Sequence, residues 1–279
     1  MNNPRVLSRL RQTRCWLLDM DGTVSLGEQA LPGTAAFFAW VAENGADYIF
    51  LTNNSSHSAS HYIKRLNSLG IPASRKHVLT STDALGTLIN QIGPVDRPAD
   101  VYAVGTPDFV SDLEAAGLNV ISGRGLKPDF VLLGFDTTLT FEKLDFACDY
   151  IRRGVPYYAA NPDRVCPLAD GRVLPDCGAL IAFMETCTGR KPRRIIGKPD
   201  TAMAEMVIAE RGYQHQELAM VGDRLYTDIA FARNAGITGI AVLSGETTRE
   251  EIVMDHNRPD LVFEDIGELA WVLKTWESS

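Results

Sequence analysis

The sequence predicts an α/β protein built on a parallel sheet, and three observations support this class. Short apolar runs alternate with amphipathic segments, each run is followed by turn-forming polar residues, and the first units follow one another as strand, helix and strand. A helix between two strands favours parallel pairing of those strands. The chain has 279 residues, of which 45% are hydrophobic, which is enough for a substantial core in one or two domains.

The first elements are predicted before residue 70. Cys15–Leu18 and Tyr48–Leu51 have the length of buried strands, and Pro32–Asn44 between them is helix-like and ends at a glycine, a typical helix stop. A second helix begins with a capping residue at Ser58 or Ser60. It places these apolar residues at helical spacing: Tyr62, Ile63, Leu66 and Leu69.

The middle of the chain contains a second set of elements. Its predicted strands are Val101–Val104, Phe130–Leu133 and Tyr157–Ala160. One of its helices carries an apolar stripe formed by Leu144, Ala147, Cys148 and Ile151. Because this block can fold on its own, we predict a core domain made of residues 1–80 and 187–279, and an inserted domain made of residues 81–186.

The last third of the chain returns to the pattern of the first. Its predicted strands are Ile195–Ile196, Leu218–Val221, Ile240–Leu243 and Leu261–Phe263. A helix is predicted to begin near Tyr226. The closing helix places four residues at the spacing of one amphipathic face: Ile266, Leu269, Ala270 and Leu273.

Composition excludes several classes of function. The formal net charge of −8 argues against a general binder of nucleic acid or anionic membranes. No apolar run approaches the roughly 18 residues that cross a bilayer, and the N-terminus lacks the apolar stretch of a signal peptide, so we expect a soluble, cytoplasmic protein. The five cysteines are odd in number and form no C-x-x-C pair, which indicates neither a disulfide framework nor a cysteine zinc site.

Two acidic residues follow the first predicted strand directly. In Leu17-Leu18-Asp19-Met20-Asp21-Gly22-Thr23, the period of a strand would put the carboxylates of Asp19 and Asp21 on one side, if the strand geometry continues that far. Ligands of open parallel α/β sheets bind outside the carboxyl ends of the strands, where these acids would lie. An ordinary Asp-x-Asp-Gly turn is the alternative interpretation.

A second pair of acids, Asp223 and Asp228, follows another predicted strand. Several converging carboxylates need a counter-ion, and hard oxygen ligands without His or thiolate favour Mg²⁺. For Asp228 alone, a favourable interaction with the start of a helix is the alternative.

An ionised Asp beside Mg²⁺ is a plausible nucleophile toward a phosphoryl group, which also needs hydrogen-bond donors and a fixed cation. Thr52, Asn53 and Asn54 follow a strand and supply donors at the entrance of the next helix. Lys198, in Gly-Lys-Pro-Asp, supplies the cation, with a solvated surface lysine as the alternative.

These four segments together resemble the haloacid dehalogenase superfamily, and the resemblance spans essentially the whole chain. They occur in the order typical of that superfamily: Asp19-Met20-Asp21-Gly22-Thr23, Leu51-Thr52-Asn53-Asn54, Gly197-Lys198-Pro199 and Gly222-Asp223 through Asp228. The resemblance implies a Rossmann-like parallel-sheet core with an inserted α/β cap domain. It also implies phosphatase chemistry.

The resemblance assigns a role to each residue. Asp19 would attack phosphorus to form an aspartyl-phosphate, and Asp21 would protonate the leaving oxygen and then activate the hydrolytic water. Thr52 and Lys198 would hold the phosphoryl group. Magnesium would be bound by the carboxylates of Asp19 and Asp223 and the backbone carbonyl of Asp21. Asp228 would support these ligands without binding the ion directly.

Spacing within the resemblance narrows the subgroup. One helix and one strand use up the residues between Asp19 and Thr52, whereas the stretch from Thr52 to Lys198 has room for an α/β cap. This layout is similar to the NagD-like and 4-nitrophenyl phosphatase branch, which also includes pyridoxal phosphatases. The segments Asn161-Pro162-Asp163 and Pro175–Leu180 strengthen the match.

Within this branch, the cap would contact the part of the substrate beyond the phosphate. Asn161, Asp163 and Cys166 are the candidate specificity residues, although Asn-Pro-Asp is also a good structural turn. Similar pyridoxal phosphatases carry a His where Cys166 precedes Pro167 here, which disfavours pyridoxal phosphate. Sugar phosphates, nucleoside monophosphates and aryl phosphates are the substrates left open.

Two other functions are also left open. A phosphoaspartate switch combines an acidic Mg²⁺ site with a Thr and a Lys, but it needs no inserted domain, and Asp21 should shorten the life of the aspartyl-phosphate. A non-catalytic scaffold would keep the fold for partner contacts only. The expected partner is a small phosphorylated substrate, and a homodimer through the cap, as in some relatives, is the further partner considered.

Overall fold

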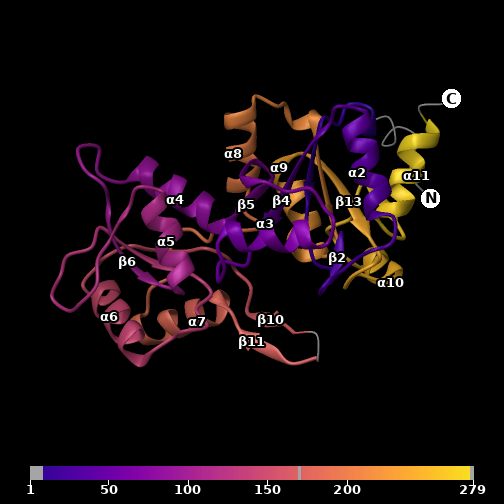
Figure 1. Ribbon diagram of the computed structural model, residues 1–279. Coiled ribbons are helices and arrows are strands. Elements are labelled where there is room, and N and C mark those ends of the chain that lie inside the picture. The colour runs from indigo at the N-terminus through magenta and orange to yellow at the C-terminus, as the bar shows by residue number, and fades with distance from the viewer. Residues whose placement is uncertain (1–8, 169–170, 277–279) are drawn as a thin grey trace. The chain divides into compact units, whose positions relative to one another are not determined.

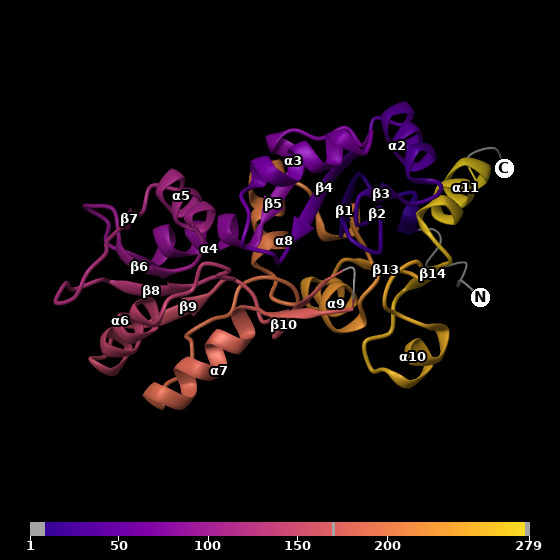
Figure 2. The same ribbon diagram turned by 60° about the horizontal axis from the view of Figure 1, so that its bottom comes forward.

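The computed structural model describes residues 9–168 and 171–276 of the chain, whose helices and strands are drawn in Figures 1 and 2. The chain divides into two compact units. Unit 1 contains the residues up to Thr52, Ala59–Leu79, and the residues from Lys198 onward. Unit 2 contains Asn53–Ser58 and Thr80–Gly197. The predicted core domain of residues 1–80 and 187–279, with a cap domain of residues 81–186, stays a prediction.

Unit 1 is built on a six-stranded sheet whose order is β14-β13-β12-β1-β4-β5. These strands are β14 (Leu261–Phe263), β13 (Thr238–Val242), β12 (Leu218–Gly222), β1 (Cys15–Leu18), β4 (Asp47–Thr52) and β5 (Val78–Thr80). Strand β1 is completely buried and pairs in parallel with β12 on one side and β4 on the other. In this register Leu18 lies opposite both Val221 and Phe50, so the carboxyl ends of the three strands meet at one edge.

Three helices bury one face of this sheet in a common apolar cluster. They are α2 (Thr34–Glu43), α3 (Ala59–Ser68) and α11 (Ile266–Trp276). The Trp16 ring of β1 meets Phe37 and Trp40 of α2 edge to face, with ring centroids 5.5 and 5.9 Å apart, a geometry that aromatic pairs favour. The remaining helical elements of unit 1 are η1 (Arg75–His77), α8 (Ala202–Arg211), η2 (His215–Glu217), η3 (Leu225–Ile229), α9 (Ala230–Ala235) and α10 (Arg249–Met254).

Unit 2 is built on a four-stranded sheet whose order is β7-β6-β8-β9, with parallel pairing between neighbours. Its strands are β6 (Asp100–Val104), β7 (Asn119–Val120), β8 (Phe130–Leu133) and β9 (Tyr157–Ala159). Its helices are α4 (Ser81–Ile92), α5 (Pro107–Ala115), α6 (Phe141–Arg152) and α7 (Cys177–Thr188). Residues of α6 and α7 share an apolar cluster with β6, β8 and β9, so these two helices cover one face of the sheet.

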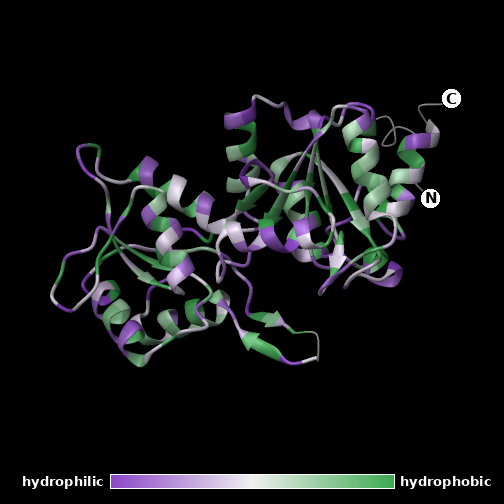
Figure 3. Ribbon diagram, viewed as in Figure 1, coloured by the Kyte–Doolittle hydropathy of each residue, from purple (hydrophilic) through white to green (hydrophobic). Residues whose placement is uncertain are grey.

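Two short antiparallel hairpins complete the fold: β2 (Ser25–Leu26) with β3 (Gln29–Ala30), and β10 (Val165–Pro167) with β11 (Val173–Pro175). Hydropathy follows the architecture, because the sheet strands are hydrophobic while most helices carry both polar and apolar residues (Figure 3). None of the helices in the described residues combines the length and the apolar character needed to cross a membrane.

The predicted α/β class with a parallel sheet is confirmed, and one predicted element, the strand at Ile195–Ile196, needs correction. Ile195–Ile196 is not a strand, because only Ile195 makes an isolated bridge, to Ala159 of β9. The helix expected near Tyr226 begins as the wider turns of η3 and becomes α-helical only from Ala230. The prediction also missed β5 and both hairpins, whose strands have only two or three residues.

Candidate active site

The carboxyl end of β1 carries Asp19 to the meeting point of the central strands. The Asp19 N–H donates to the carbonyl oxygen of Val221 at 2.9 Å, so the pairing with β12 continues one residue past the strand. About a fifth of the Asp19 side chain, 20%, is exposed. This carboxylate therefore lies at the sheet edge, beside the end of β12.

Asp223 follows β12 directly and is almost completely buried. Its Oδ2 accepts the N–H of Glu246 at 2.8 Å, whereas its Oδ1 is buried and has no hydrogen-bond partner among the described residues. Burial, followed by the charges of Asp19 and Asp228, raises the pKa of Asp223 well above its ordinary value. Gly245 makes room for this carboxylate, since a Cβ there would lie 1.9 Å from Asp223 Oδ2.

Asp228 comes from η3 and is fully buried beneath the end of β12. Its Oδ2 accepts the N–H of Arg224 at 3.1 Å, which fixes the carboxylate against the first turn of η3. Gly222 permits this close approach, because a Cβ at Gly222 would lie 2.3 Å from Asp228 Cβ. Burial raises the pKa of Asp228 above its ordinary value, although Lys198 acts in the opposite direction.

Lys198 supplies a buried cation between two of these acids. Its Nζ donates to Asp19 Oδ1 and lies 2.7 Å from Asp228 Oδ1, and the residue is only 2% exposed. Burial alone would lower the pKa of Lys198, but the charges of Asp19 and Asp228 outweigh it and raise this pKa above its ordinary value. The ammonium group is therefore a fixed positive charge, and the alternative of a solvated surface lysine is excluded.

Three carboxylates form a set that fits a divalent cation. One oxygen each from Asp19, Asp223 and Asp228 lies within 4.8 Å of the others. Lys198 balances only one of these charges, and the buried Asp223 Oδ1 lacks a partner among the described residues. Oxygen ligands of this kind suit Mg²⁺. The predicted contribution of the Asp21 carbonyl stays a prediction.

The carboxylate of Asp21 is turned toward a different partner from that of Asp19. Both Asp21 oxygens accept hydrogen bonds from the Arg65 guanidinium of α3, one of them at 3.1 Å, and Arg65 also donates to the carbonyl of Gly27 at 2.8 Å. The carboxylates of Asp19 and Asp21 were predicted to lie on one side only if the geometry of strand β1 continued as far as Asp21, and it does not. Strand β1 ends at Leu18, and the Met20 carbonyl accepts the N–H groups of a tight turn. Nothing in the sequence pattern pointed to Arg65 as a partner of Asp21.

The predicted phosphate-binding segment begins where β4 ends. Thr52 is the buried last residue of β4, whose neighbour in the sheet is β1, so it lies at the same sheet edge as Asp19. The Asn53 amide donates to Asp163 Oδ2 at 3.1 Å. The Asn54 Oδ1 accepts both the N–H and the hydroxyl of Ser56, at 2.9 and 2.7 Å. The side chains of Asn53 and Asn54 therefore hold their own loop in this structure.

Known proteins resemble this chain over nearly its whole length. Residues 16–119 match the haloacid dehalogenase-like hydrolases, and residues 195–269 match a family described as HAD-hydrolase-like. A 5'-nucleotidase of Bacillus subtilis is 32% identical, over 92% of this chain and 96% of its own length. The chain belongs to the haloacid dehalogenase-like hydrolase family.

Other members of the family agree with this assignment. An acid sugar phosphatase of Staphylococcus epidermidis is 32% identical over 92% of this chain and 97% of its own length. A 4-nitrophenylphosphatase from Thermotoga maritima superposes with a TM-score of 0.88 and 40% identity, covering 94% of this chain and 98% of that one. A glycerol phosphate phosphatase from Mycobacterium tuberculosis, in complex with magnesium, superposes with a TM-score of 0.86 and 31% identity. The superposition covers 95% of this chain and 77% of that one. The predicted superfamily, its NagD-like branch and the enzyme class of phosphatase are confirmed.

The three specificity candidates of this hydrolase lie in two different environments within unit 2. Asn161 is fully buried, and its amide donates to the carbonyl oxygen of Asn53 at 2.8 Å. Asp163 is partly buried and accepts from the Asn53 amide. Cys166 lies in the β10–β11 hairpin, opposite Leu174, and is half-buried. Asp163 and Cys166 are thus both partly exposed, whereas Asn161 is not.

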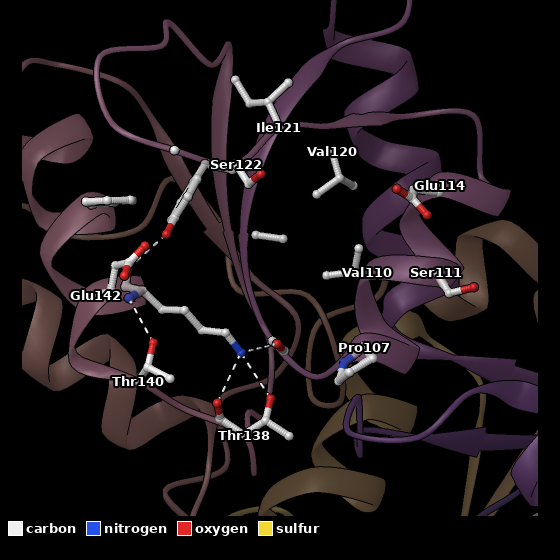
Figure 4. Close-up of a pocket in the computed structure, with 16 residues that line it drawn as sticks. Pro107, Val110, Ser111, Glu114, Val120, Ile121, Ser122, Thr138, Thr140 and Glu142 are labelled. Atoms are coloured by element: carbon white, nitrogen blue, oxygen red, sulfur yellow. Dashed lines mark hydrogen bonds between the residues drawn. The ribbon is translucent and has the colours of Figure 1, made fainter.

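A separate pocket of about 610 Å³ is lined by residues of unit 2 alone (Figure 4). Its lysine, Lys143, is already neutralised, because the Nζ lies 2.7 Å from Asp136 Oδ2 and 3.0 Å from Thr138 Oγ1. Glu114 and Glu142 add negative charge to the lining. The charges of this lining would therefore repel a phosphate dianion.

Proposed function

We propose that this chain is a magnesium-dependent phosphomonoesterase that hydrolyses small phosphorylated metabolites through an aspartyl-phosphate on Asp19. The observation that carries the proposal is the contact of Asp19 with the buried cation Lys198, in a group of three carboxylates that fits a divalent ion. This arrangement offers a nucleophile and positive charge at the edge of a parallel sheet, where α/β proteins bind their ligands.

In the first half-reaction, a carboxylate oxygen of Asp19 attacks phosphorus while the bond to the leaving oxygen breaks. The leaving oxygen takes its proton from Asp21. Lys198 orients Asp19 and balances negative charge on the phosphoryl oxygens, and the Thr52 hydroxyl donates to one of those oxygens. When bound, Mg²⁺ would be held by Asp19 and Asp223, with Asp228 behind them, and would supply further positive charge for the phosphoryl oxygens.

In the second half-reaction, water attacks the same phosphorus, Asp21 accepts a proton from this water, and the bond between phosphorus and Asp19 breaks. Inorganic phosphate leaves, and Asp19 is regenerated as a carboxylate. Asp21 is paired with Arg65 in the structure, so both proton transfers require Asp21 to exchange the guanidinium for a substrate or water oxygen. Arg65 then remains held by the carbonyl of Gly27.

The substrate class follows from what the relatives have in common. They are named for a nucleotide, a sugar phosphate, glycerol phosphate and 4-nitrophenyl phosphate, and all of these are phosphate monoesters with different remainders. We propose that this chain also acts on small monoesters. All such substrates need a site for the phosphoryl group, and the position of Lys198 at the sheet edge supports placing it there.

The proposal is tested with Asp19→Asn, which removes the nucleophile's charge with little change of volume. Turnover of 4-nitrophenyl phosphate should fall at least about 1,000-fold, with an unchanged circular dichroism spectrum. Asp149→Asn, which alters an exposed ion pair of helix α6, is the matched control and should retain wild-type turnover. Wild-type turnover by Asp19→Asn, with contamination excluded, would reject the mechanism.

The lifetime of the intermediate separates an enzyme from a phosphoaspartate switch. When labelled substrate is replaced by unlabelled substrate and samples are quenched in acid at successive times, the wild type should lose radioactive phosphate from Asp19 rapidly, whereas Asp21→Asn should retain it, because water activation is lost. A label on the wild type that persists for minutes would instead indicate a switch.

A further inference from the structure

Three separate segments of unit 2 meet in a small polar cluster around Asn53. Asn161 Nδ2 donates to the Asn53 carbonyl oxygen at 2.8 Å, and Asn161 Oδ1 accepts the N–H of Asp163 at 2.9 Å. Asp163 Oδ2 in turn accepts the Asn53 amide at 3.1 Å. Ser81, at the start of α4, adds a hydroxyl that donates to the same Asn53 carbonyl at 3.0 Å. The backbone and the side chain of Asn53 are thus both held.

Gly197 closes the cluster from the other side. A Cβ at Gly197 would lie 2.7 Å from the carbonyl oxygen of Ala160, 2.8 Å from Asn53 Oδ1 and 3.1 Å from Asn161 Cβ, and its φ of 46° is in the left-handed region. Only a glycine therefore fits between Asn53 and Asn161 without displacing one of them. The packing ties the backbone before Lys198 to the backbone after Thr52.

The covalent neighbours of this cluster are the two groups proposed to hold phosphate. Asn53 directly follows Thr52 in the chain, and Gly197 directly precedes Lys198. Fixing Asn53 and Gly197 against Asn161 therefore restricts the backbone at Thr52 and Lys198.

We propose that Asn161 and Asp163 are positioning residues of the phosphate-binding segments, and that they act on every substrate alike. This inference rests on the proposed phosphatase function. A direct role in substrate selection does not suit Asn161, which is 0% exposed and uses both ends of its amide within the cluster. Asp163 holds the Asn53 amide through Oδ2, so its carboxylate is also committed to the loop.

The first test is Asn161→Ala, assayed on glycerol phosphate, a sugar phosphate, a nucleoside monophosphate and 4-nitrophenyl phosphate. The value of kcat/KM should fall by about 10- to 100-fold, since a misplacement of about 1 Å at reacting groups costs about 100-fold. The loss should be the same for all four substrates within about threefold, because the phosphoryl group is common to them. Gly197→Ala, which forces the cluster apart from the opposite side, should produce the same uniform loss.

Inhibition by inorganic phosphate separates positioning from a loss of folded protein. A smaller folded fraction lowers the apparent kcat but leaves the inhibition constant of phosphate unchanged. Misplaced Thr52 and Lys198 should raise that constant about tenfold in Asn161→Ala. An unchanged inhibition constant would overturn the proposal.

The conservative variant at Asp163 gives an independent check. Asp163→Asn keeps an oxygen that accepts the Asn53 amide, so it should stay within about threefold of the wild type, whereas Asp163→Ala should lose about tenfold. Asn90→Ala is the matched control, because the Asn90 amide also donates to a backbone carbonyl at 2.8 Å, on the exposed side of helix α4. The kcat/KM of Asn90→Ala should equal that of the wild type.

The outcomes distinguish this inference from the proposed function. A wild type that hydrolyses none of the four esters with Mg²⁺ refutes the proposed function and, with it, the inference. An active wild type whose Asn161→Ala variant changes the ratio between two substrates more than about tenfold refutes the positioning role only, and restores a role in specificity.

Discussion

Asp176 contributes to the pH dependence of this protein's stability, and Asp176→Asn should remove that contribution. Asp176 caps helix α7 and is 4% exposed. Burial raises the pKa of Asp176 to about 7, and the nearby charge of Asp163 acts in the same direction, against hydrogen bonds from the Cys177 N–H and the Asn161 side chain. The protonated carboxyl is therefore the form that the folded protein favours.

The size of the effect follows from the two pKa values. In the unfolded chain Asp176 has its ordinary pKa of 3.8, and in the folded chain a pKa of about 7. The folded state consequently binds more protons than the unfolded state between these values, so stability is greatest below about pH 4 and falls as the pH rises to about 7. A difference of about three pKa units lowers the free energy of unfolding by at most about 4 kcal/mol above about pH 7.

The variant isolates this contribution, because asparagine is also a good helix cap and carries no charge. At about pH 8, Asp176→Asn should be more stable than the wild type by up to about 4 kcal/mol, and at about pH 4 the two should be equal within about 0.5 kcal/mol. Urea unfolding followed by circular dichroism at several pH values measures both. As a control, Asp149→Asn should have the same free energy of unfolding as the wild type at each pH. If wild type and Asp176→Asn lose stability in parallel across this range, the reasoning is refuted.

Two further variants test the carboxylate group itself. Lys198→Met leaves three acids without their buried cation, so without divalent ions at neutral pH we expect a loss of about 3–5 kcal/mol in urea unfolding, partly restored by Mg²⁺. Stability equal to that of the wild type would contradict the assigned role of Lys198. Gly245→Ala places a Cβ 1.9 Å from Asp223 Oδ2, so Asp223 must move, and the Mg²⁺ concentration for half-maximal activity should rise by about tenfold or more. An unchanged Mg²⁺ titration would show that Asp223 does not contribute to metal binding.

The sequence predicted the fold where patterns were long enough to be distinctive. Cys15–Leu18 was identified with its observed bounds because a buried central strand is apolar throughout. Strand β5, at the edge of the six-stranded sheet, has only three residues, and no periodicity can be recognised in so short a segment. The opposite error occurred at Ile195–Ile196, where two apolar residues suggested a strand although only one backbone bridge forms.

The site could be predicted in part because strand ends are visible in a sequence. Asp19, Thr52 and Asp223 each follow an apolar run, and parallel strands bring such positions to one edge. Arg65 could not be found in this way, since its contact with Asp21 depends on how helix α3 packs beside the β2–β3 hairpin. The burial of Asn161 was equally invisible, because Asn-Pro-Asp has the composition of an exposed turn.

In the proposed mechanism, the separation of Asp19 from Asp21 would let two neighbouring carboxylates perform different tasks. In a continued strand, both would face the same cation and would repel each other. The chain instead bends after Leu18, so that Asp19 contacts Lys198, which is 2% exposed, while Asp21 contacts Arg65 with 57% of its own side chain in solvent. A nucleophile benefits from the buried, immobile partner, which fixes its geometry and its charge. An acid and base benefits from the exposed position, because protons and water must reach it.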